Sequence, residues 1–218
     1  MFICRRRDIG AVIAAAGDDL APADKRMYAL RDVTGTVESV PLIASSIMSK
    51  KIAEGTGALV LDVKVGSGAF LPDIDQARSL ASTMVGLGTA HGVRTSAIIT
   101  DMDQPLGLAV GNALEVTESV EVLAGGGPPD VVEVTLALAR RMVELAGGDV
   151  DPATVVADGS AMDRWNRMIR AQGGDPSATL PTATEVETVS APTAGFVRRI
   201  DARKVGEAAW RLGAGRAR

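Results

Sequence analysis

A short apolar run, a helix and a second apolar run in the first half of the chain constrain the fold more than any other feature. Residues 58–65 are mostly apolar and end at Gly66 and Gly68, which is typical of a buried strand that opens into a tight loop. Residues 73–88 have the apolar spacing of a helix, and residues 93–100 form the second run. Two strands joined through a helix pair in parallel by a right-handed crossover. The sequence therefore predicts an α/β fold.

Further helices are predicted on both sides of this unit. Apolar residues recur at helical spacing over residues 39–54, where Ser39 is a suitable N-cap, Pro41 fits the first turn and Gly55 fits the exit. Helices are also predicted over residues 112–123, 130–146, 161–171 and 201–212.

Short strands are predicted near both ends of the chain. Apolar and polar residues alternate over residues 184–189 and 195–198. Residues 9–16 form a small, apolar run after the arginines at 5–7, a pattern that a secretion signal shares with a buried strand. The run is at the lower length limit for a signal, so we interpret it as a strand, followed by a turn-like segment over residues 18–25.

The composition excludes several classes of function. A net charge of −4 and only 3% aromatic residues argue against a nucleic-acid-binding surface. One Cys and one His permit neither a disulfide framework nor a zinc cluster, and His91 is accompanied by no nucleophile-elbow serine, so we interpret it as structural. No stretch approaches the roughly 18 apolar residues of a membrane span. We therefore expect a soluble, cytoplasmic protein that acts on small molecules without nucleic-acid or membrane partners.

The loop after the first predicted strand has two interpretations. Gly66, Ser67 and Gly68 let backbone N–H groups approach an anion, as in a phosphate cradle. The segment is neither a Walker loop nor a full glycine fingerprint, because position 71 is Leu. A purely structural turn between strand and helix explains it equally well.

A second candidate site combines a basic segment with the helix that follows it. Ser46 and Lys50 are four residues apart on one helix face, and Arg31 precedes that helix. Arg offers a planar fork of donors, Lys a compact positive charge, and a hydroxyl both donates and accepts. This set suits a small planar heterocycle with carbonyl oxygens and a ring N–H. The alternative is a solvated helix face with ion pairs inside the helix.

Six segments of the chain resemble one protein family. They are residues 20–26, 28–39, 45–51, 62–70, 100–107 and 111–118. Their residues and order resemble those of the thymidine phosphorylase and pyrimidine-nucleoside phosphorylase family. The resemblance covers nearly the whole chain, thinning after about residue 145. It implies an α/β fold with a mixed sheet and flanking helices, together with part of a small helical domain.

The resemblance also implies a division of the chain into four parts. Residues 1–22 would hold the first strand of the α/β domain and a hinge, and residues 23–54 a portion of the small helical domain with the base-binding residues. Residues 55–180 would form the α/β domain, and residues 181–218 the incomplete start of a β-rich C-terminal portion. Substrate would bind in the cleft between the two domains.

The implied activity is the reversible phosphorolysis of a pyrimidine nucleoside. Thymidine and phosphate would give thymine and 2-deoxyribose 1-phosphate, as part of pyrimidine salvage. The resemblance implies that Arg31, Ser46 and Lys50 bind the pyrimidine, and that Arg31 and Lys50 stabilise negative charge on it during catalysis. Tyr28, one helical turn before Arg31, would line the same pocket. Inorganic phosphate would be the co-substrate, no organic cofactor is implied, and members of the family act as homodimers.

Some members of the family also bind a potassium ion. The matching positions are Leu106 and Ala109, through their backbone carbonyls, and Glu118, through its carboxylate. Oxygen ligands suit such a hard cation.

The chain departs from the family pattern at both ends. The family's N-terminal signature and its Lys-x-Ser-Thr-Gly-Gly phosphate loop do not occur in these 218 residues, and neither does the C-terminal portion of the family's α/β domain, which would follow Gly213. We therefore expect an interior piece of a longer enzyme. The alternative to an active phosphorylase is a catalytically inactive fragment that lacks the phosphate-binding loop.

Overall fold

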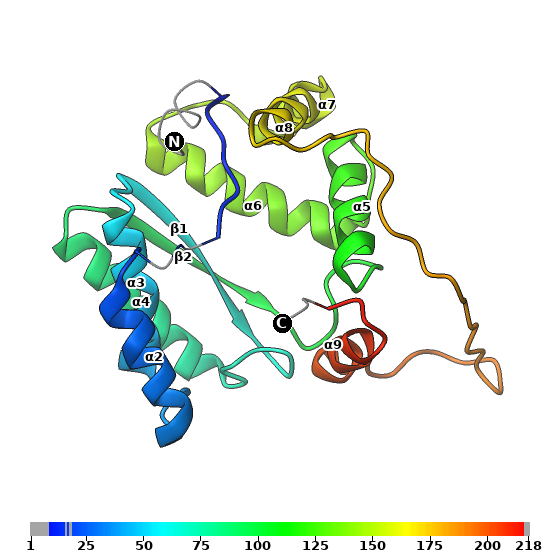
Figure 1. The fold of residues 1–218 in the computed structure, drawn as a ribbon, viewed down its shortest axis with the longest axis horizontal. Helices are drawn as coiled ribbons and strands as arrows, with labels where there is room; N and C mark the ends of the chain where they lie inside the picture. Colours follow the sequence, from blue (N-terminus) through cyan, green and yellow to red (C-terminus); the bar gives the residue numbers. More distant parts are fainter. Residues whose placement is uncertain (1–8, 16, 18, 216–218) are drawn as a thin grey trace. The chain divides into compact units, whose positions relative to one another are not determined.

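The computed structural model describes residues 9–15, 17 and 19–215 (Figure 1). By their contacts the residues divide into two compact units, one of residues 13–102 and 133–154 and the other of the remaining residues. The arginines at 5–7 lie outside the described residues. Within the described part no helix combines the length and the apolar character needed to cross a membrane.

The first unit is built on two parallel strands. β1 (Ala58–Val65) pairs with β2 (Arg94–Asp101) in a register that runs from Ala58 opposite Arg94 to Val65 opposite Asp101. α4 (Ile74–Ala90) joins them, and the Asp73 carboxylate caps it by accepting from the N–H groups of Asp75 and Gln76. The predicted strand–helix–strand unit and the α/β class are confirmed. The sheet described here consists of these two parallel strands.

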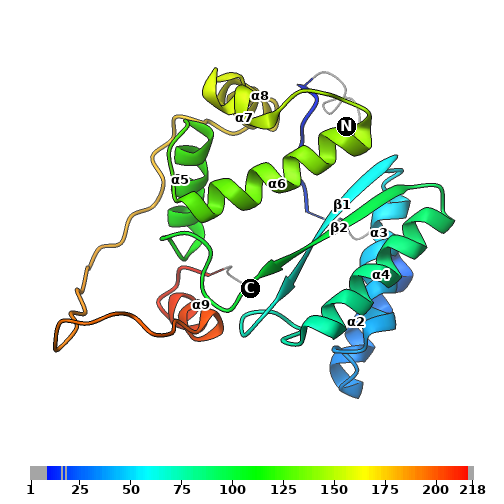
Figure 2. The same ribbon diagram turned by 180° about the vertical axis from the view of Figure 1, so that it is seen from behind.

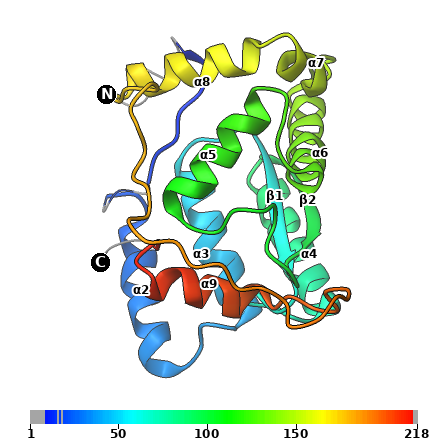
Figure 3. The ribbon, with the colours of Figure 1, turned by 90° about the vertical axis from the view of Figure 1, so that its right-hand side faces the viewer.

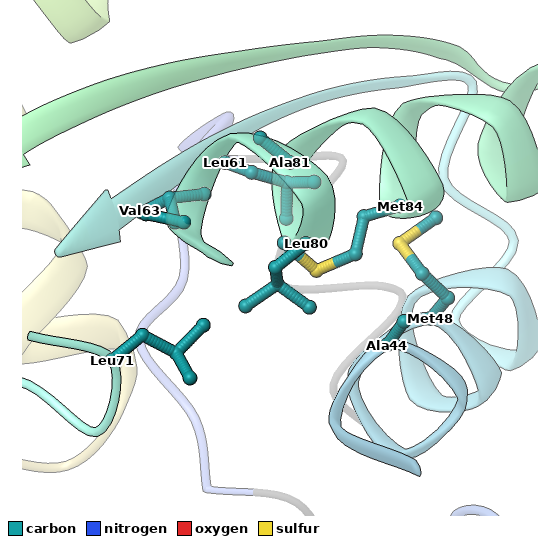
Figure 4. Close-up of a cluster of buried hydrophobic side chains, with 9 residues drawn as sticks. Ala44, Met48, Leu61, Val63, Leu71, Leu80, Ala81 and Met84 are labelled. Carbon is teal, nitrogen blue, oxygen red and sulfur yellow. The ribbon is translucent and has the colours of Figure 1, made fainter. Parts of the chain in front are cut away.

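α3 (Val40–Ala53) and α4 cover the same side of the two strands (Figure 2). The core between them is an apolar cluster to which Leu71, after β1, also contributes (Figure 4). Its buried members are Ala44, Met48, Leu61, Val63, Leu71, Ala77, Leu80, Ala81 and Met84. Met48 and Met84 are its largest fully buried side chains. The apolar positions that predicted a helix over residues 39–54 are thus the positions that pack.

α2 (Pro22–Thr34) precedes α3 and begins within residues 18–25, for which the sequence predicts a turn-like segment. The correction has a physical reason: a proline is compatible with the first turn of a helix, whose N–H groups have no partner within the helix. The helix ends at Gly35, which has a positive φ of 65° and donates its N–H to the Arg31 carbonyl. Glycine has no Cβ atom and therefore adopts this left-handed conformation without a steric penalty. The turn leads the chain back along α3.

The second unit contains α5 (Asn112–Leu123), α8 (Ser160–Ala171) and α9 (Ala202–Arg211), all close to their predicted ranges. The short α7 (Pro152–Ala157) and the longer α6 (Pro129–Ala146) each contribute residues to both units.

The short strands predicted near the two ends are not formed. Residues 11–15 have no regular secondary structure, and neither do residues 184–189 and 195–198, which lie in the exposed stretch between α8 and α9 (Figure 3). A strand needs a hydrogen-bonded neighbour, and in the described part β1 and β2 pair only with each other. Alternating residues give a segment one apolar and one polar face, but they do not provide a second strand for it to pair with. The domain boundaries at residues 22, 54 and 180 stay predictions.

Two glycines of α4 should respond in opposite ways to substitution by alanine. A Cβ atom at Gly88 would lie 2.0 Å from the Thr95 Oγ1 atom, whereas nothing lies within 4 Å of one at Gly86. We expect Gly88→Ala to lower the free energy of unfolding by about 1–3 kcal/mol through overpacking. Gly86→Ala should raise it by up to about 1 kcal/mol through helix propensity. Urea unfolding measures both, and equal effects would contradict this close approach of α4 to β2.

Candidate functional site

Three polar side chains meet where α2 and α3 lie side by side. Ser46 and Lys50 are one turn apart on α3, and Asp24 belongs to the first turn of α2. The Ser46 hydroxyl donates to the Asp24 Oδ2 atom at 3.0 Å, and the Lys50 ammonium donates to the same oxygen. Asp24 and Ser46 are only 5% and 6% exposed. The buried carboxylate therefore joins the two predicted site residues on α3.

The Lys50 ammonium makes further contacts within this group. Besides Asp24, it donates to the Ser46 carbonyl at 2.8 Å and lies 3.2 Å from the Ser46 hydroxyl oxygen. Its side chain is still 30% exposed. The ammonium is thus held in place by protein atoms while part of it is accessible to a ligand.

A pocket of about 330 Å³ opens beside these groups. Its lining residues are Gly17, Leu20, Ala21, Asp24, Lys25, Tyr28, Ser46 and Lys50. The lining combines apolar residues such as Leu20 and Ala21 with the carboxylate of Asp24, the hydroxyl of Ser46 and two lysines. This combination of a mostly apolar surface and a few fixed polar groups is typical of a small-molecule site.

Arg31 is placed differently from the other predicted residues. It is 5% exposed, and its guanidinium donates to three backbone carbonyls, those of Thr36 at 3.4 Å, Leu42 at 3.2 Å and Val37. The guanidinium carbon lies 5.3 Å from the centre of the Tyr28 ring, within cation–π distance. Arg31 therefore ties the connection between α2 and α3 together, a role that its sequence position did not reveal.

Arg31 also lines a second, smaller pocket of about 130 Å³. The other residues around it are Tyr28, Val37, Ile43, Ser46, Ile47 and Phe70. Tyr28 and Ser46 border both pockets, whereas Lys50 borders the larger and Arg31 the smaller. The structure thus brings all four predicted residues to adjoining cavities of the first unit.

Asp24 is the member of the site that sequence reasoning missed. A signal was present, because Asp24, Tyr28 and Arg31 have the spacing i, i+4 and i+7, which puts them on one face of a helix. That signal depended on recognising α2 from its first residue. The composition of residues 18–25 predicts a turn instead, and a turn does not place the carboxylate on the same face as Tyr28 and Arg31.

The predicted potassium ligands belong to the second unit. The Glu118 carboxylate accepts from the Leu108 N–H at 2.8 Å, and a Cβ atom at Gly107 would lie 2.1 Å from its other oxygen. Glu118 on α5 is therefore packed against the loop that holds Leu106 and Ala109. The backbone carbonyls of this loop and the Glu118 carboxylate are oxygen ligands, which suit a hard cation. Among the described residues there is no group of three or more His, Cys, Asp or Glu side chains that suits a metal.

The geometry defines an α/β protein with a charged, partly buried pocket. The sequence pattern of the glycosyl transferase family, a/b domain, matches residues 6–161, and the chain belongs to this family.

Curated relatives include a thymidine phosphorylase of Mycobacterium tuberculosis. It is 66% identical over 212 residues, which cover 97% of this chain and 49% of that protein. The pyrimidine-nucleoside phosphorylases of Geobacillus stearothermophilus and Bacillus subtilis are each 50% identical, over 95% and 97% of this chain and 50% and 51% of theirs. The chain spans about half the length of the curated relatives it matches.

Removing the Arg31 guanidinium should destabilise the first unit. Arg31→Ala leaves three carbonyls at the α2–α3 connection without their charged donor, so we expect the free energy of unfolding to fall by about 3 kcal/mol. Arg78→Ala is the matched control, because Arg78 is an exposed arginine paired with Asp75 at 3.0 Å. The control should change stability by at most about 0.5 kcal/mol. Similar urea midpoints for both variants would contradict the structural role of Arg31.

Proposed function

We propose that this chain takes part in the phosphorolysis of pyrimidine nucleosides and supplies the groups that hold the base. Thymidine and inorganic phosphate would react to give thymine and 2-deoxyribose 1-phosphate. The observation that carries the proposal is the convergence of Asp24, Ser46 and Lys50 on one pocket. The names of the relatives, which are thymidine and pyrimidine-nucleoside phosphorylases, support the choice of substrate class.

Phosphorolysis requires the site to stabilise a leaving group. As phosphate attacks the anomeric carbon of the sugar, the glycosidic bond breaks and its electron pair goes to the base. Lys50 would donate to a carbonyl oxygen of the base, where the negative charge gathers, and Ser46 would contact the ring nitrogen beside it. Fixed donors in a partly buried site stabilise such charge more than water does. No covalent intermediate with the protein is required.

Arg31 would act from the smaller pocket. A guanidinium has five N–H donors, and each of its three nitrogens here donates to one backbone carbonyl. Two N–H groups are then left for a second carbonyl oxygen of the base. Because the rest of the guanidinium is anchored, it would meet the base in a fixed orientation, as electrostatic stabilisation requires.

The activity is tested with the purified chain in two assays. Phosphate-dependent release of thymine from thymidine, followed by chromatography, tests phosphorolysis. Calorimetric titration with thymine tests the base site by itself. Binding without turnover would favour the alternative, a catalytically inactive fragment that keeps the base pocket, and absence of both would refute the proposal.

Lys50 and its neighbour Lys51 form a matched pair for mutation. Lys51 is exposed and pairs with Glu54 at 3.1 Å, away from the pocket. We expect Lys50→Met to weaken thymine binding about tenfold or more, which corresponds to the loss of one charged hydrogen bond, and to lower any turnover in parallel. Lys51→Met should leave the dissociation constant unchanged. Equal effects of the two substitutions, with the fold verified by circular dichroism, would remove Lys50 from the site.

We further propose that the backbone carbonyls of Leu106 and Ala109, with the Glu118 carboxylate, hold a potassium ion. The ion would neutralise the carboxylate and brace the loop before α5, without entering the reaction. A ligand that binds only the folded state raises the melting temperature. We expect KCl to raise it relative to NaCl at equal ionic strength in the unmodified chain. Glu118→Gln, which keeps an acceptor for the Leu108 N–H, should abolish this difference, and its persistence would rule the site out.

A further inference from the structure

We propose that Asp24 determines which hydrogen-bonding pattern the pocket accepts. By accepting the hydrogen bond that the Ser46 hydroxyl donates, Asp24 leaves Ser46 as an acceptor toward the ligand. The pocket then selects a base that presents a ring N–H beside a carbonyl oxygen, as uracil and thymine do. This inference rests on the proposed binding of a pyrimidine base in this pocket.

The direction of the Ser46–Asp24 hydrogen bond follows from the chemistry of the two groups. The Asp24 Oδ2 atom, 3.0 Å from the Ser46 hydroxyl, also forms the ion pair with the Lys50 ammonium. An ionised carboxylate can only accept hydrogen bonds, so the serine must donate. A hydroxyl has one proton, and this contact uses it.

The remaining capacity of Ser46 can be counted. Its hydroxyl oxygen has two acceptor positions. The Lys50 ammonium has three N–H donors, of which one goes to Asp24 and one to the Ser46 carbonyl. The third is directed to the Ser46 hydroxyl oxygen, 3.2 Å from the Lys50 Nζ atom, and a carbonyl oxygen of the ligand can take it over. Ser46 borders the pocket, so toward a ligand it accepts a hydrogen bond and donates none.

Burial keeps this arrangement from relaxing. Asp24 and Ser46 are almost inaccessible to solvent, so water is a poor substitute for either partner. Both residues belong to helices, and the Lys50 ammonium is held by Asp24 and by the Ser46 carbonyl. If the Ser46 hydroxyl donated elsewhere, the buried Asp24 carboxylate would lose one of its hydrogen-bond donors, which is costly.

The ligand chemistry that matches is specific. In uracil and thymine the N3 atom carries a hydrogen and is flanked by two carbonyl groups. Such a base can donate its N3–H to Ser46 and accept from Lys50 on the adjacent oxygen. In cytosine the N3 atom is itself an acceptor, so its lone pair would face that of Ser46. The C5 methyl group of thymine plays no part in this contact. Uracil and thymine therefore belong to the same class of ligand for this pocket.

Asp24→Ala tests the proposal by freeing the Ser46 proton. The measured quantity is the ratio of the dissociation constants of cytosine and uracil, obtained by titration of the 218-residue chain. We expect a ratio of about tenfold or more in the unmodified chain, the effect of one hydrogen bond replaced by an opposed pair of acceptors. In Asp24→Ala the ratio should fall to within about threefold. Asp24→Asn preserves the size of the side chain and keeps an oxygen that can accept from Ser46, so its ratio should stay closer to that of the unmodified chain than the ratio of Asp24→Ala.

A double substitution separates this role from a general effect on the pocket. If Asp24 acts through the Ser46 hydroxyl, Asp24→Ala should not change the ratio in a chain that already carries Ser46→Ala. If it acts only by supporting Lys50, the ratio should change equally with and without Ser46. Asp75→Ala, which alters an exposed aspartate of α4, is the matched control and should leave the ratio unchanged.

The outcomes are distinguishable from a failure of the proposed function. A chain that binds uracil with an unchanged ratio in Asp24→Ala would overturn the role of Asp24 while keeping the base site. A change of ratio that persists in the Ser46→Ala chain would also overturn it. A chain that binds neither uracil nor cytosine would refute the base site and this inference together.

Discussion

The parallel pairing of β1 with β2 is the constraint on which the rest of this structure depends. It requires a crossover, and that crossover, α4, lies on one face of the strands and presents Met84 to α3. α3 must then bury Ala44 and Met48 against α4, because these are its fully packed apolar side chains. In this orientation of α3 about its axis, Ser46 and Lys50 face α2. The site is therefore a consequence of how the core is packed.

The ion pair between Asp24 and Lys50 specifies geometry more than it adds stability. Removing a carboxylate from water is costly, and a nearby ammonium repays the cost only when the remaining hydrogen-bonding positions are filled. Here Ser46 fills one of them and also contacts the ammonium. The result is a small network in which the Ser46 proton and two of the three Lys50 N–H groups have fixed acceptors. Such a network suits the recognition of a planar molecule with alternating donors and acceptors.

Much of the fold could be predicted from local patterns. The apolar runs at β1 and β2 and the cap at Asp73 mark their elements clearly, because each depends on residues close in sequence. Prediction failed where a pattern needed a distant partner. The alternating segments between α8 and α9 look like strands, yet no neighbour pairs with them in the described part of the chain. Residues 18–25 have the composition of a turn, although α2 begins within them at Pro22.

The sequence by itself determined the strand–helix–strand unit and the shared face of Ser46 and Lys50, because helical and strand periodicity act over a few residues. Only the tertiary structure decided that Asp24, 22 residues before Ser46 and 26 before Lys50, completes their group. It also decided that the Arg31 guanidinium is anchored by backbone carbonyls. These contacts depend on how α2 is placed against α3. That placement is set by the left-handed turn at Gly35 and by the burial of polar groups that must find partners within the protein.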